Sequence, residues 1–457
     1  MKFKIVAVKD GVNQTFHYDN MDNILSNQDE MIFENGLESK KPKKEYVSFS
    51  PEEPLIKSRD ITGLKIQLGL TCNYSCEYCS QRFVPRADET SRKHVESFIH
   101  KLENINFNEN AGLKIELWGG EPFVYWKTIK PLIKALKEKF ETWKKKPRYS
   151  IISNGSLLTE EICDWIVENI DGFAISHDGP GQHVRGPDPF DDEKTAKIIL
   201  DLYERMGNKM SFNTMLNAKN MSRKEIYDWF KNFTGKETLK IGEGSLVDAY
   251  DEGGISLSLN TKKEHFEFRK TTFKELYEHE GDINFPVIIN KINSFVNGVL
   301  SHDSAKYVGQ KCSMDSENII AVDLRGNVLT CQNVSEVSIN SNNQPHLSGN
   351  LDNYDDVRIT TSTHWSNRKE CSDCPVLHLC RGACMFVTDE FWTKTCDNSY
   401  SDNVALFAIA FEKITGHIPV YFDNEHLPPE RRDIWGSILE HKEEIKKKPF
   451  PIPVISG

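Results

Sequence analysis

The sequence lacks any run of about 18 or more consecutive apolar residues, the length that a helix needs to cross a membrane. Its first residues also lack an uninterrupted apolar segment followed by a small-residue cleavage site, so we expect no signal peptide. Basic residues are not in excess, because the formal net charge is −11 and the lysine-rich stretches near 143–148 and 444–450 are short. These absences predict a cytoplasmic protein with neither a membrane nor a nucleic-acid partner.

The cysteines lack the even count that a disulfide framework needs, because there are 11 of them. All except Cys163 fall into two groups, one between residues 72 and 79 and the other between residues 312 and 396. Tight C-x2-C spacings in a chain without a secretion signal predict metal ligation in a reducing compartment. Cys163 stands apart in the amphipathic stretch EEICDWIVENI, where we expect a buried, small apolar side chain.

What the sequence does have is an alternation of strand-like and helix-like segments between residues 62 and 250. Apolar runs, each followed by an amphipathic stretch, predict strands at 64–71, 113–120, 149–155, 172–179, 210–217 and 239–247. Six βα repeats with right-handed crossovers predict an α/β fold, a partial (β/α)6 barrel of the TIM-like kind. In such barrels the functional loops follow the carboxyl ends of the strands.

The segments on either side of the barrel differ from it in composition. The region after residue 310 is loop-rich and has too little apolar material to fold unaided, so bound clusters would stabilise it. We predict an N-terminal extension at 1–60 with a strand pair at 2–18, the partial barrel at 61–255, a helical bridge at 256–309, a cysteine-rich domain at 310–397, and a C-terminal helix and proline-rich tail at 398–457.

The stretch GLTCNYSCEYCSQ at 69–81 follows the first predicted strand and carries Cys72, Cys76 and Cys79 in the pattern C-x3-C-x2-C. Three thiolates are soft ligands that suit an iron–sulfur cluster or zinc. A structural zinc ion needs a fourth ligand, and the only other cysteine in the barrel sequence is Cys163, on a predicted helix. A [4Fe–4S] cube held by three thiolates would instead keep one iron without a protein ligand.

This pattern at this position, with the aromatic Tyr78 before the last cysteine, resembles the radical S-adenosylmethionine superfamily. The resemblance implies that S-adenosylmethionine chelates the open iron through its amino and carboxylate groups. The reduced cluster would then split the sulfonium and release a 5′-deoxyadenosyl radical that abstracts hydrogen from the substrate. It also implies an electron donor of the flavodoxin or ferredoxin type.

Other strand ends fit the same resemblance. WGGEP at 118–122 matches the family's GGEP motif, although Gly-Gly-Glu-Pro is also a serviceable turn. Its glycines would allow a close approach by the methionine portion, and Glu121 could accept a hydrogen bond from the amino group. Arg185 is a candidate carboxylate clamp or part of a surface loop, and Asn213 faces the same cavity or is a satisfied interior amide. The resemblance implies cofactor contacts from Tyr78, Gly119, Gly120, Glu121, Pro122, Asn154, Ser176, Asp178, Arg185 and Asn213.

The later cysteines are spaced C-x13-G-x4-C, then C-x2-C-x5-C-x3-C, and then a single last cysteine. This spacing resembles the SPASM domain, an auxiliary-cluster module of radical enzymes that modify peptides and proteins. A zinc ribbon built on the middle four is the alternative, but it leaves the other cysteines unexplained. The resemblance implies two auxiliary [4Fe–4S] clusters, one held by Cys371, Cys374, Cys380 and Cys396 and the other by Cys312, Cys331 and Cys384.

The set of three lacks the fourth cysteine that many relatives carry a few residues before the first. Here that stretch is SHDSAKYVGQK. Either His302, Asp303 or another side chain completes the cluster, or one iron is open. Our hypothesis from the sequence is an open iron that binds a substrate group such as a thiolate.

Gln332 follows the second cysteine of this region, where sulfatase-maturating relatives have an aspartate that acts as a base. An amide cannot usefully take a proton, which weakens the sulfatase-maturase interpretation, and no residue pattern assigns a catalytic acid or base. We therefore predict a radical maturase that forms a thioether or carbon–carbon crosslink in a ribosomally made precursor peptide. Residues 1–60 of this chain would help to hold the leader of that peptide. The alternatives are a sulfatase-type Cys/Ser dehydrogenase, a radical enzyme acting on a small molecule, and a non-catalytic iron–sulfur electron-transfer protein.

Overall fold

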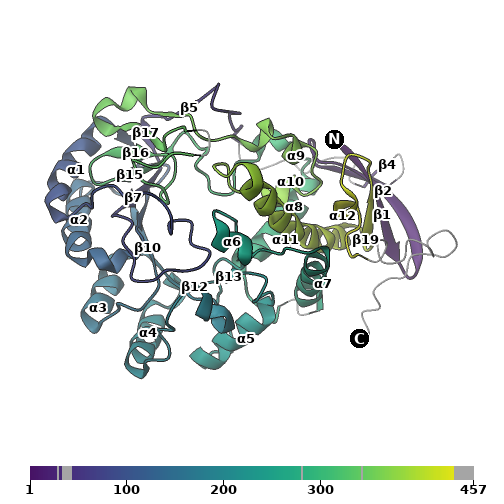
Figure 1. Cartoon of the computed structure of the whole chain (residues 1–457), viewed down its shortest axis with the longest axis horizontal. Helices are drawn as coiled ribbons and strands as arrows, with labels where there is room; N and C mark the ends of the chain where they lie inside the picture. Colours follow the sequence, from purple (N-terminus) through teal and green to yellow (C-terminus); the bar gives the residue numbers. More distant parts are fainter. Residues whose placement is uncertain (28–29, 33–43, 279–280, 341–342, 437–457) are drawn as a thin grey trace.

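The computed structural model describes residues 1–27, 30–32, 44–278, 281–340 and 343–436 (Figure 1). The proline-rich end of the predicted C-terminal tail lies outside these ranges. Among the helices that the ranges contain, none is long and apolar enough to span a membrane.

The centre of the molecule is an eight-stranded sheet in the order β12-β11-β10-β9-β7-β15-β16-β17. Its first five strands are parallel and match the first five predicted strands: β7 (Gly63–Gln67), β9 (Lys114–Trp118), β10 (Arg148–Ser153), β11 (Gly172–Ser176) and β12 (Met210–Asn213). The helices that alternate with them are α1 (Val95–Lys101), α2 (Trp126–Lys139), α3 (Glu160–Asn169), α4 (Glu193–Met206) and α5 (Arg223–Thr234). Figure 1 shows these helices in an arc outside the sheet, which confirms the predicted α/β partial barrel.

Local sequence sets where these helices begin and which face they bury. The side chains of Thr159, Asp192 and Ser222 accept hydrogen bonds from backbone N–H groups in the first turns of α3, α4 and α5. Each helix then buries its apolar residues toward the sheet, as Ile162 and Ile166 of α3 do. Cys163 is also buried, at 1% exposure, as expected of a small apolar side chain.

The sixth predicted strand, 239–247, is much shorter than expected. Ile241 forms only an isolated bridge with Phe212, and β14 (Ser245–Leu246) pairs in parallel with β13 (Met215–Leu216). The glycines of this segment explain the break, because Gly244 has φ +73°, a left-handed conformation that interrupts an extended strand.

The cysteine-rich region adds strands to the central sheet, which the sequence did not predict. β15 (Ile319–Asp323) pairs in parallel with β7, and β16 (Asn327–Leu329) and β17 (Leu347–Asn350) continue the sheet in antiparallel fashion. The sheet is therefore mixed and open, not a closed barrel. Cys331 follows β16 closely, so this pairing carries the cysteine-rich region to the edge of the barrel.

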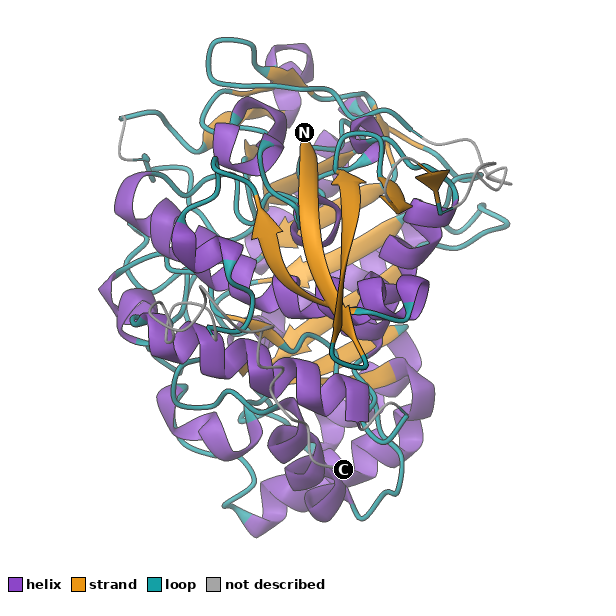
Figure 2. Ribbon diagram, turned by 90° about the vertical axis from the view of Figure 1, so that its right-hand side faces the viewer, coloured by secondary structure: helices purple, strands orange, loops and turns teal. Residues whose placement is uncertain are grey.

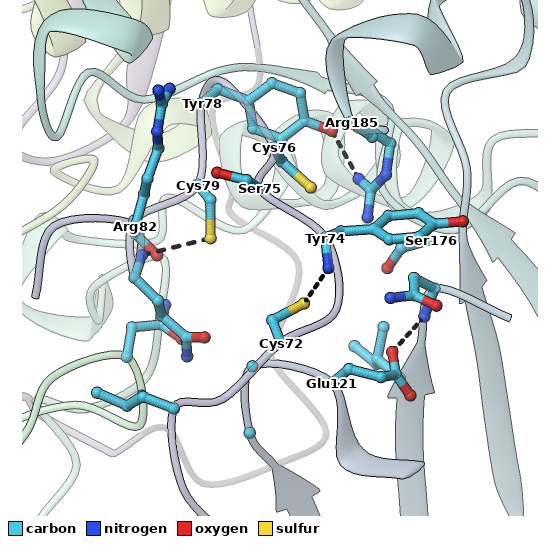
Figure 3. Close-up of a pocket in the computed structure, with 18 of the residues that line it drawn as sticks. Cys72, Tyr74, Ser75, Cys76, Tyr78, Cys79, Arg82, Glu121, Ser176 and Arg185 are labelled. Atoms are coloured by element: carbon cyan, nitrogen blue, oxygen red, sulfur yellow. Dashed lines mark hydrogen bonds between the residues drawn. The ribbon is translucent and has the colours of Figure 1, made fainter. Parts of the chain in front are cut away.

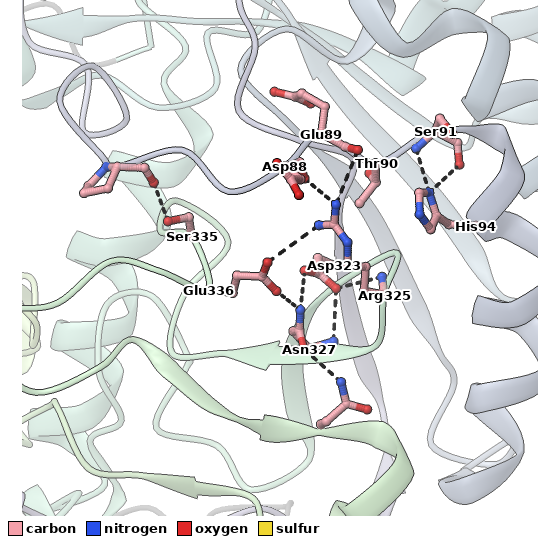
Figure 4. Close-up of polar contacts among 12 residues, drawn as sticks. Asp88, Glu89, Thr90, Ser91, His94, Asp323, Arg325, Asn327, Ser335 and Glu336 are labelled. Carbon is pink, nitrogen blue, oxygen red and sulfur yellow. Dashed lines mark hydrogen bonds and ion pairs between the residues drawn. The ribbon is translucent and has the colours of Figure 1, made fainter.

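Arg325, in the turn between β15 and β16, joins this hairpin to the segment that follows the cysteine loop (Figure 4). Its guanidinium donates hydrogen bonds to the backbone oxygens of Asp88, at 2.6 Å, and Glu89, at 3.4 Å. It also lies 3.7 Å from the Glu336 carboxylate. We call this set of contacts the Arg325 joint.

The first and last described segments form a second sheet, in the order β19-β1-β2-β3-β4. The predicted strand pair is present as β1 (Lys2–Lys9) and β2 (Val12–Asp19), which pair with β19 (Ile418–Asp423) and β3 (Ile24–Asn27); β4 (Glu30–Met31) is the other edge. Figure 2 faces this sheet, with strands of the central sheet visible behind it. Phe16 and Tyr18 pack on Phe411 and Phe407 of helix α11 (Asp389–Thr415), so the sheet is fixed to the body of the protein.

Helices α7 (Lys262–Glu278) and α8 (Pro286–Leu300) pack against α11 in the predicted helical bridge. The remaining short elements are β5 (Leu55–Ile56), β6 (Asp60–Ile61), β8 (Asn106–Phe107), α6 (Glu252–Ser256), β18 (Arg358–Ile359), α9 (Lys369–Ser372), α10 (Leu377–Cys380) and α12 (Pro429–Arg432). One large apolar core runs from the parallel sheet to α11 and the N-terminal sheet.

Candidate functional site

A cavity of about 340 Å³ lies at the carboxyl ends of the parallel strands, where the fold predicts the chemistry (Figure 3). Its walls come from the loops after β7, β9, β10 and β11, from the segment after β14, and from Asn333. The predicted site residues that line it are Cys72, Cys76, Tyr78, Cys79, Gly119, Gly120, Glu121, Asn154, Ser176 and Arg185. The structure therefore brings the cysteine loop and three other strand ends to one place.

The three thiols of the cysteine loop face a common space in Figure 3. Backbone N–H groups donate to two of the sulfurs, that of Tyr74 to Cys72 at 3.3 Å and that of Gln81 to Cys79 at 3.4 Å. Burial raises the pKa of Cys76 to about 11, and the neighbouring Arg185 guanidinium opposes this shift. A bound cationic metal would deprotonate such thiols, and these donors would stabilise the resulting thiolates.

The geometry of this loop suits a cluster with several irons. Within the described ranges, no three His, Cys, Asp or Glu side chains are placed so that they could share one metal ion. A [4Fe–4S] cube does not need such convergence, because each thiolate binds a different iron. The three thiols, with space beside them in the cavity, thus fit the group that the sequence implies.

Gly120 lets the loop after β9 pack directly on the cysteine loop. A Cβ at this position would lie 2.5 Å from the backbone oxygen of Thr71 and 2.6 Å from that of Leu70. The N–H groups of Gly120 and Glu121 donate to the backbone oxygens of Gly69 and Thr71, both at 3.1 Å. From the sequence, we expected the cofactor to approach these glycines closely. At Gly120, however, the backbone of the cysteine loop occupies that space.

Glu121 ties the second strand end to the third. Its carboxylate is 1% exposed and accepts hydrogen bonds from Ser153 Oγ at 2.8 Å, Asn154 N at 2.7 Å and Phe123 N at 3.1 Å. Burial raises the pKa of Glu121, and these donors counteract part of the rise. Pro122 starts the short 3-10 helix Pro122–Tyr125 and is not among the lining residues.

Tyr78, Asp178 and Arg185 form a connected polar group on the opposite wall. Tyr78 Oη donates to Asp178 Oδ2 at 2.5 Å, and Arg185 Nη1 donates to Tyr78 Oη at 2.6 Å. Asp178 is fully buried, accepts from the Met215 N–H at 2.9 Å and lies behind the cavity wall. Arg185 does line the cavity, and its Nε has no hydrogen-bond partner among the described residues. This guanidinium is held in place and retains a donor for an anionic ligand.

Asn213 differs from its expected place. It pairs with Ser176 where β12 meets β11, but it is not a lining residue, because its amide oxygen packs against Gly242. Sequence reasoning also missed several lining residues: Arg82, Arg86, Trp118, Asp248, Tyr250 and Asn333. The strand-end rule could have found Asp248 and Tyr250, since both closely follow the sixth strand.

The seven later cysteines separate into two groups by their mutual electrostatic effects. Burial is the main cause that raises the pKa of Cys371, and the neighbouring thiols of Cys380, Cys396 and Cys374 raise it further. In the other group, burial raises the pKa of Cys331 to about 11, and Cys312 adds to it. Cys384 is likewise influenced by Cys312 and Cys331. These groups have the same members as the two ligand sets that the SPASM resemblance implies.

The two side chains suggested as completing ligands lie elsewhere. His302 and Asp303 follow the end of α8, where their N–H groups donate to backbone oxygens of Val299 and Gly298, and Asp303 lies near His378. Gln332 is buried at 7% exposure and stays outside the cavity lining. Its backbone oxygen accepts from Gln67 Nε2 at 2.7 Å, and its side-chain oxygen lies 3.5 Å from Lys65 Nζ.

Comparisons with known proteins agree with this geometry. The family model described as the radical SAM superfamily matches residues 66–231. The radical SAM cyclopropyl synthase TigE of Paramaledivibacter caminithermalis is 25% identical over 342 residues, which cover 71% of this chain and 68% of that protein. The cysteine-type anaerobic sulfatase-maturating enzyme of Clostridium perfringens is 22% identical over 336 residues, covering 68% of this chain and 85% of that protein.

The fold is similar to that of a solved structure named "Native anSMEcpe with bound AdoMet and Cp18Cys peptide". The TM-score is 0.54 at 18% identity, and the match covers 77% of this chain and 99% of that one. These findings confirm the resemblance to the radical SAM superfamily that the cysteine loop and the GGEP motif indicate.

Proposed function

Because residues 66–231 form a domain of the radical SAM superfamily, we propose that this chain is a radical maturase of a ribosomally made precursor peptide. The observation that carries the proposal is that one cavity is lined both by the cysteine loop and by residues beside the later cysteines. Its wall contains the three thiols of the cysteine loop together with Asp248, Tyr250 and Asn333, which neighbour the later group of Cys331 and Cys384. A substrate in this cavity would contact both regions at once.

The cofactors proposed are S-adenosylmethionine and three [4Fe–4S] clusters. Cys72, Cys76 and Cys79 would hold the first cluster, and the two later cysteine groups would hold the auxiliary clusters. When bound, S-adenosylmethionine and the first cluster supply a 5′-deoxyadenosyl radical for hydrogen abstraction. Arg185 would orient the methionine carboxylate through its free Nε–H, while Tyr78 and Asp178 hold the guanidinium.

The relatives support a peptide substrate and a carbon–carbon bond. A cyclopropyl synthase makes a ring of three carbons, and the structure similar in fold holds a peptide as well as AdoMet. Of the thioether and carbon–carbon crosslinks, we therefore favour the second. A leader segment would bind near the sheet formed by β1 to β4, a flavodoxin or ferredoxin would deliver the electron, and the enzyme would work in the cytoplasm.

A Cys/Ser dehydrogenase of the sulfatase-maturating type is the second candidate, supported by similarity over 85% of the Clostridium perfringens enzyme. The buried amide of Gln332, outside the cavity, weakens it, because it offers no proton acceptor to the substrate. A radical enzyme acting on a small molecule is a further alternative.

The test is coexpression of the chain with short peptides encoded beside its gene, followed by mass spectrometry. A loss of about two hydrogens from one peptide, with fragments showing a carbon–carbon link, is the expected result. The variant with alanine at Cys72, Cys76 and Cys79 should give no product, and Cys163→Ala should give the normal amount. If the reconstituted enzyme with reductant and S-adenosylmethionine forms no 5′-deoxyadenosine, every catalytic version of the proposal fails.

A further inference from the structure

Asp248 is a carboxylate in the cavity wall with one oxygen unused. It follows β14, at the carboxyl end of the sixth repeat, and only 12% of its side chain is exposed. Its Oδ2 lies 3.6 Å from Lys311 Nζ and accepts from Tyr250 Oη at 3.4 Å. Its Oδ1 is buried and has no hydrogen-bond partner in the described part of the chain. A buried anionic oxygen without a donor is costly unless something else binds it.

The surroundings of Asp248 belong to the group of Cys312, Cys331 and Cys384. Lys311, which pairs with Asp248, is the residue before Cys312. Burial raises the pKa of Tyr250, and the neighbouring Cys384, Asp248 and Cys331 raise it further. The Tyr250 hydroxyl links the two groups, because it is hydrogen-bonded to Cys384 and lies 3.4 Å from Asp248 Oδ2.

The other candidates for the missing ligand are less well placed. His302 and Asp303 follow the end of α8, and the Tyr250 hydroxyl is neutral and already hydrogen-bonded to Asp248 and Cys384. The side-chain oxygen of Gln332 lies 3.5 Å from both Cys331 Sγ and Lys65 Nζ, but it belongs to a neutral amide, a weaker iron ligand than a carboxylate. Of these residues, Asp248 alone combines an anionic oxygen, proximity to Cys384 and the lack of a competing donor.

We propose that Asp248 Oδ1 is the fourth protein ligand of the cluster held by Cys312, Cys331 and Cys384. The inference rests on the proposed function, because that cluster is part of it. It replaces our hypothesis from the sequence of an open iron that binds a substrate thiolate. Lys311 and Tyr250, which contact Oδ2, act as positioning residues that aim Oδ1 at the cluster. The ligated iron would border the cavity without a vacant position for the substrate.

The experiment uses the full chain with alanine at Cys72, Cys76 and Cys79, so that only the auxiliary clusters remain. This background is needed because the first cluster has its own open iron. After anaerobic reconstitution and reduction, iron content and the electron paramagnetic resonance spectrum are measured with and without cyanide. With Asp248 present, cyanide should leave the spectrum unchanged. In D248A it should shift the signal of one cluster, because an iron has become accessible.

Two further variants keep the test decisive. D248C should again resist cyanide and should have a lower reduction potential, because a thiolate donates more electron density than a carboxylate. This result supports the proposal even if D248A loses the cluster. E243Q is the matched control, because Glu243 also acts on Lys311 but has no resolved effect on Cys384. Its spectrum should match that of the parent.

A cyanide-sensitive spectrum with Asp248 in place would overturn the proposal, and so would spectra of D248A and D248C identical to the parent. Failure of the proposed function looks different. In that case the background chain would bind roughly four irons or fewer, where two auxiliary clusters need roughly eight. Alternatively, the intact chain would form no 5′-deoxyadenosine while its cluster spectra respond to Asp248 as expected.

Discussion

Several residues that line the cavity also hold its walls together through hydrogen bonds, either to one another or to residues behind the wall. Glu121 links two strand ends through hydrogen bonds from Ser153 and Asn154, and Tyr78 and Arg185 both contact the buried Asp178. The motifs therefore mark residues whose structural role the structure shows directly. Their contacts with S-adenosylmethionine remain predictions.

Arg185→Lys should weaken binding of S-adenosylmethionine by roughly tenfold or more, because an ammonium group lacks the planar fork that both contacts Tyr78 and reaches an anion. Anaerobic equilibrium dialysis measures the affinity, and iron content shows whether the cluster is retained. Arg205→Lys is the control, because Arg205 pairs with Asp164 at 2.8 Å on the surface. Equal affinity of Arg185→Lys and wild type would contradict the clamp.

Glu121→Gln should reduce the free energy of unfolding by about 1–3 kcal/mol, because the new amide NH2 would face a backbone N–H. Anaerobic denaturant titration of the reconstituted chain measures this loss. Glu96→Gln, an exposed position on α1, should change it little. If the two variants were equally stable, the hydrogen bonds that Glu121 accepts would contribute nothing to the stability of the chain.

At the scale of elements, the loop after β9 packs on the cysteine loop because Gly120 has no Cβ. The sequence predicted the five parallel strands and the alternating helices because their apolar periodicity is strong. It did not predict that Gly120 contacts Thr71, since a contact between two loops leaves no periodic pattern. It also overextended the sixth strand, because an apolar run does not reveal the left-handed Gly244.

Gly120→Ala should lower iron incorporation at the first cluster severalfold, because its Cβ would meet backbone oxygens that cannot move independently of the cysteine loop. Iron and sulfide analysis of the reconstituted chain, compared with the variant in which Cys72, Cys76 and Cys79 are alanine, measures the share of that cluster. Gly172→Ala in β11 is the control, since its Cβ would meet only Ser150 Cβ at an ordinary 3.5 Å. Normal iron content in Gly120→Ala would show that the two loops can separate without loss.

Helices α7 and α11 carry a pH-sensitive contact. His265 Nδ1 lies 2.8 Å from Ser401 Oγ, and burial lowers the pKa of His265 to about 4. The unfolded chain binds this proton near pH 6.5, so stability should fall as the pH decreases from 6.5 toward 4, by about 1–2 kcal/mol at pH 5. His265→Gln should lose less melting temperature than wild type between pH 7 and pH 5. An equal loss in both proteins would remove His265 as the cause.

Over the whole molecule, the cysteine-rich region is built into the barrel sheet through β15, β16 and β17. The sequence separated these parts, because the strands are short and the cysteine spacing dominates the pattern. The assignment of the later cysteines to two clusters stays a prediction from their spacing. Asp248 does not stand out in the sequence, because no motif surrounds it. It is also 136 residues from Cys384, so only the folded chain brings the two together.

The Arg325 joint ties this hairpin to the backbone that leaves the cysteine loop, so a change in the cysteine-rich region should be felt at the first cluster. Arg325→Ala should increase hydrogen exchange of residues 82–90 by roughly tenfold, because two charge-assisted hydrogen bonds to Asp88 and Glu89 are lost. Mass spectrometry of the exchanged peptides measures this. Arg358→Ala is the control, since Arg358 donates to the nearby backbone oxygens of Asp355 and Val357. If exchange at 82–90 stayed at the wild-type rate, the sheet pairing of β7 with β15 would by itself couple the two regions.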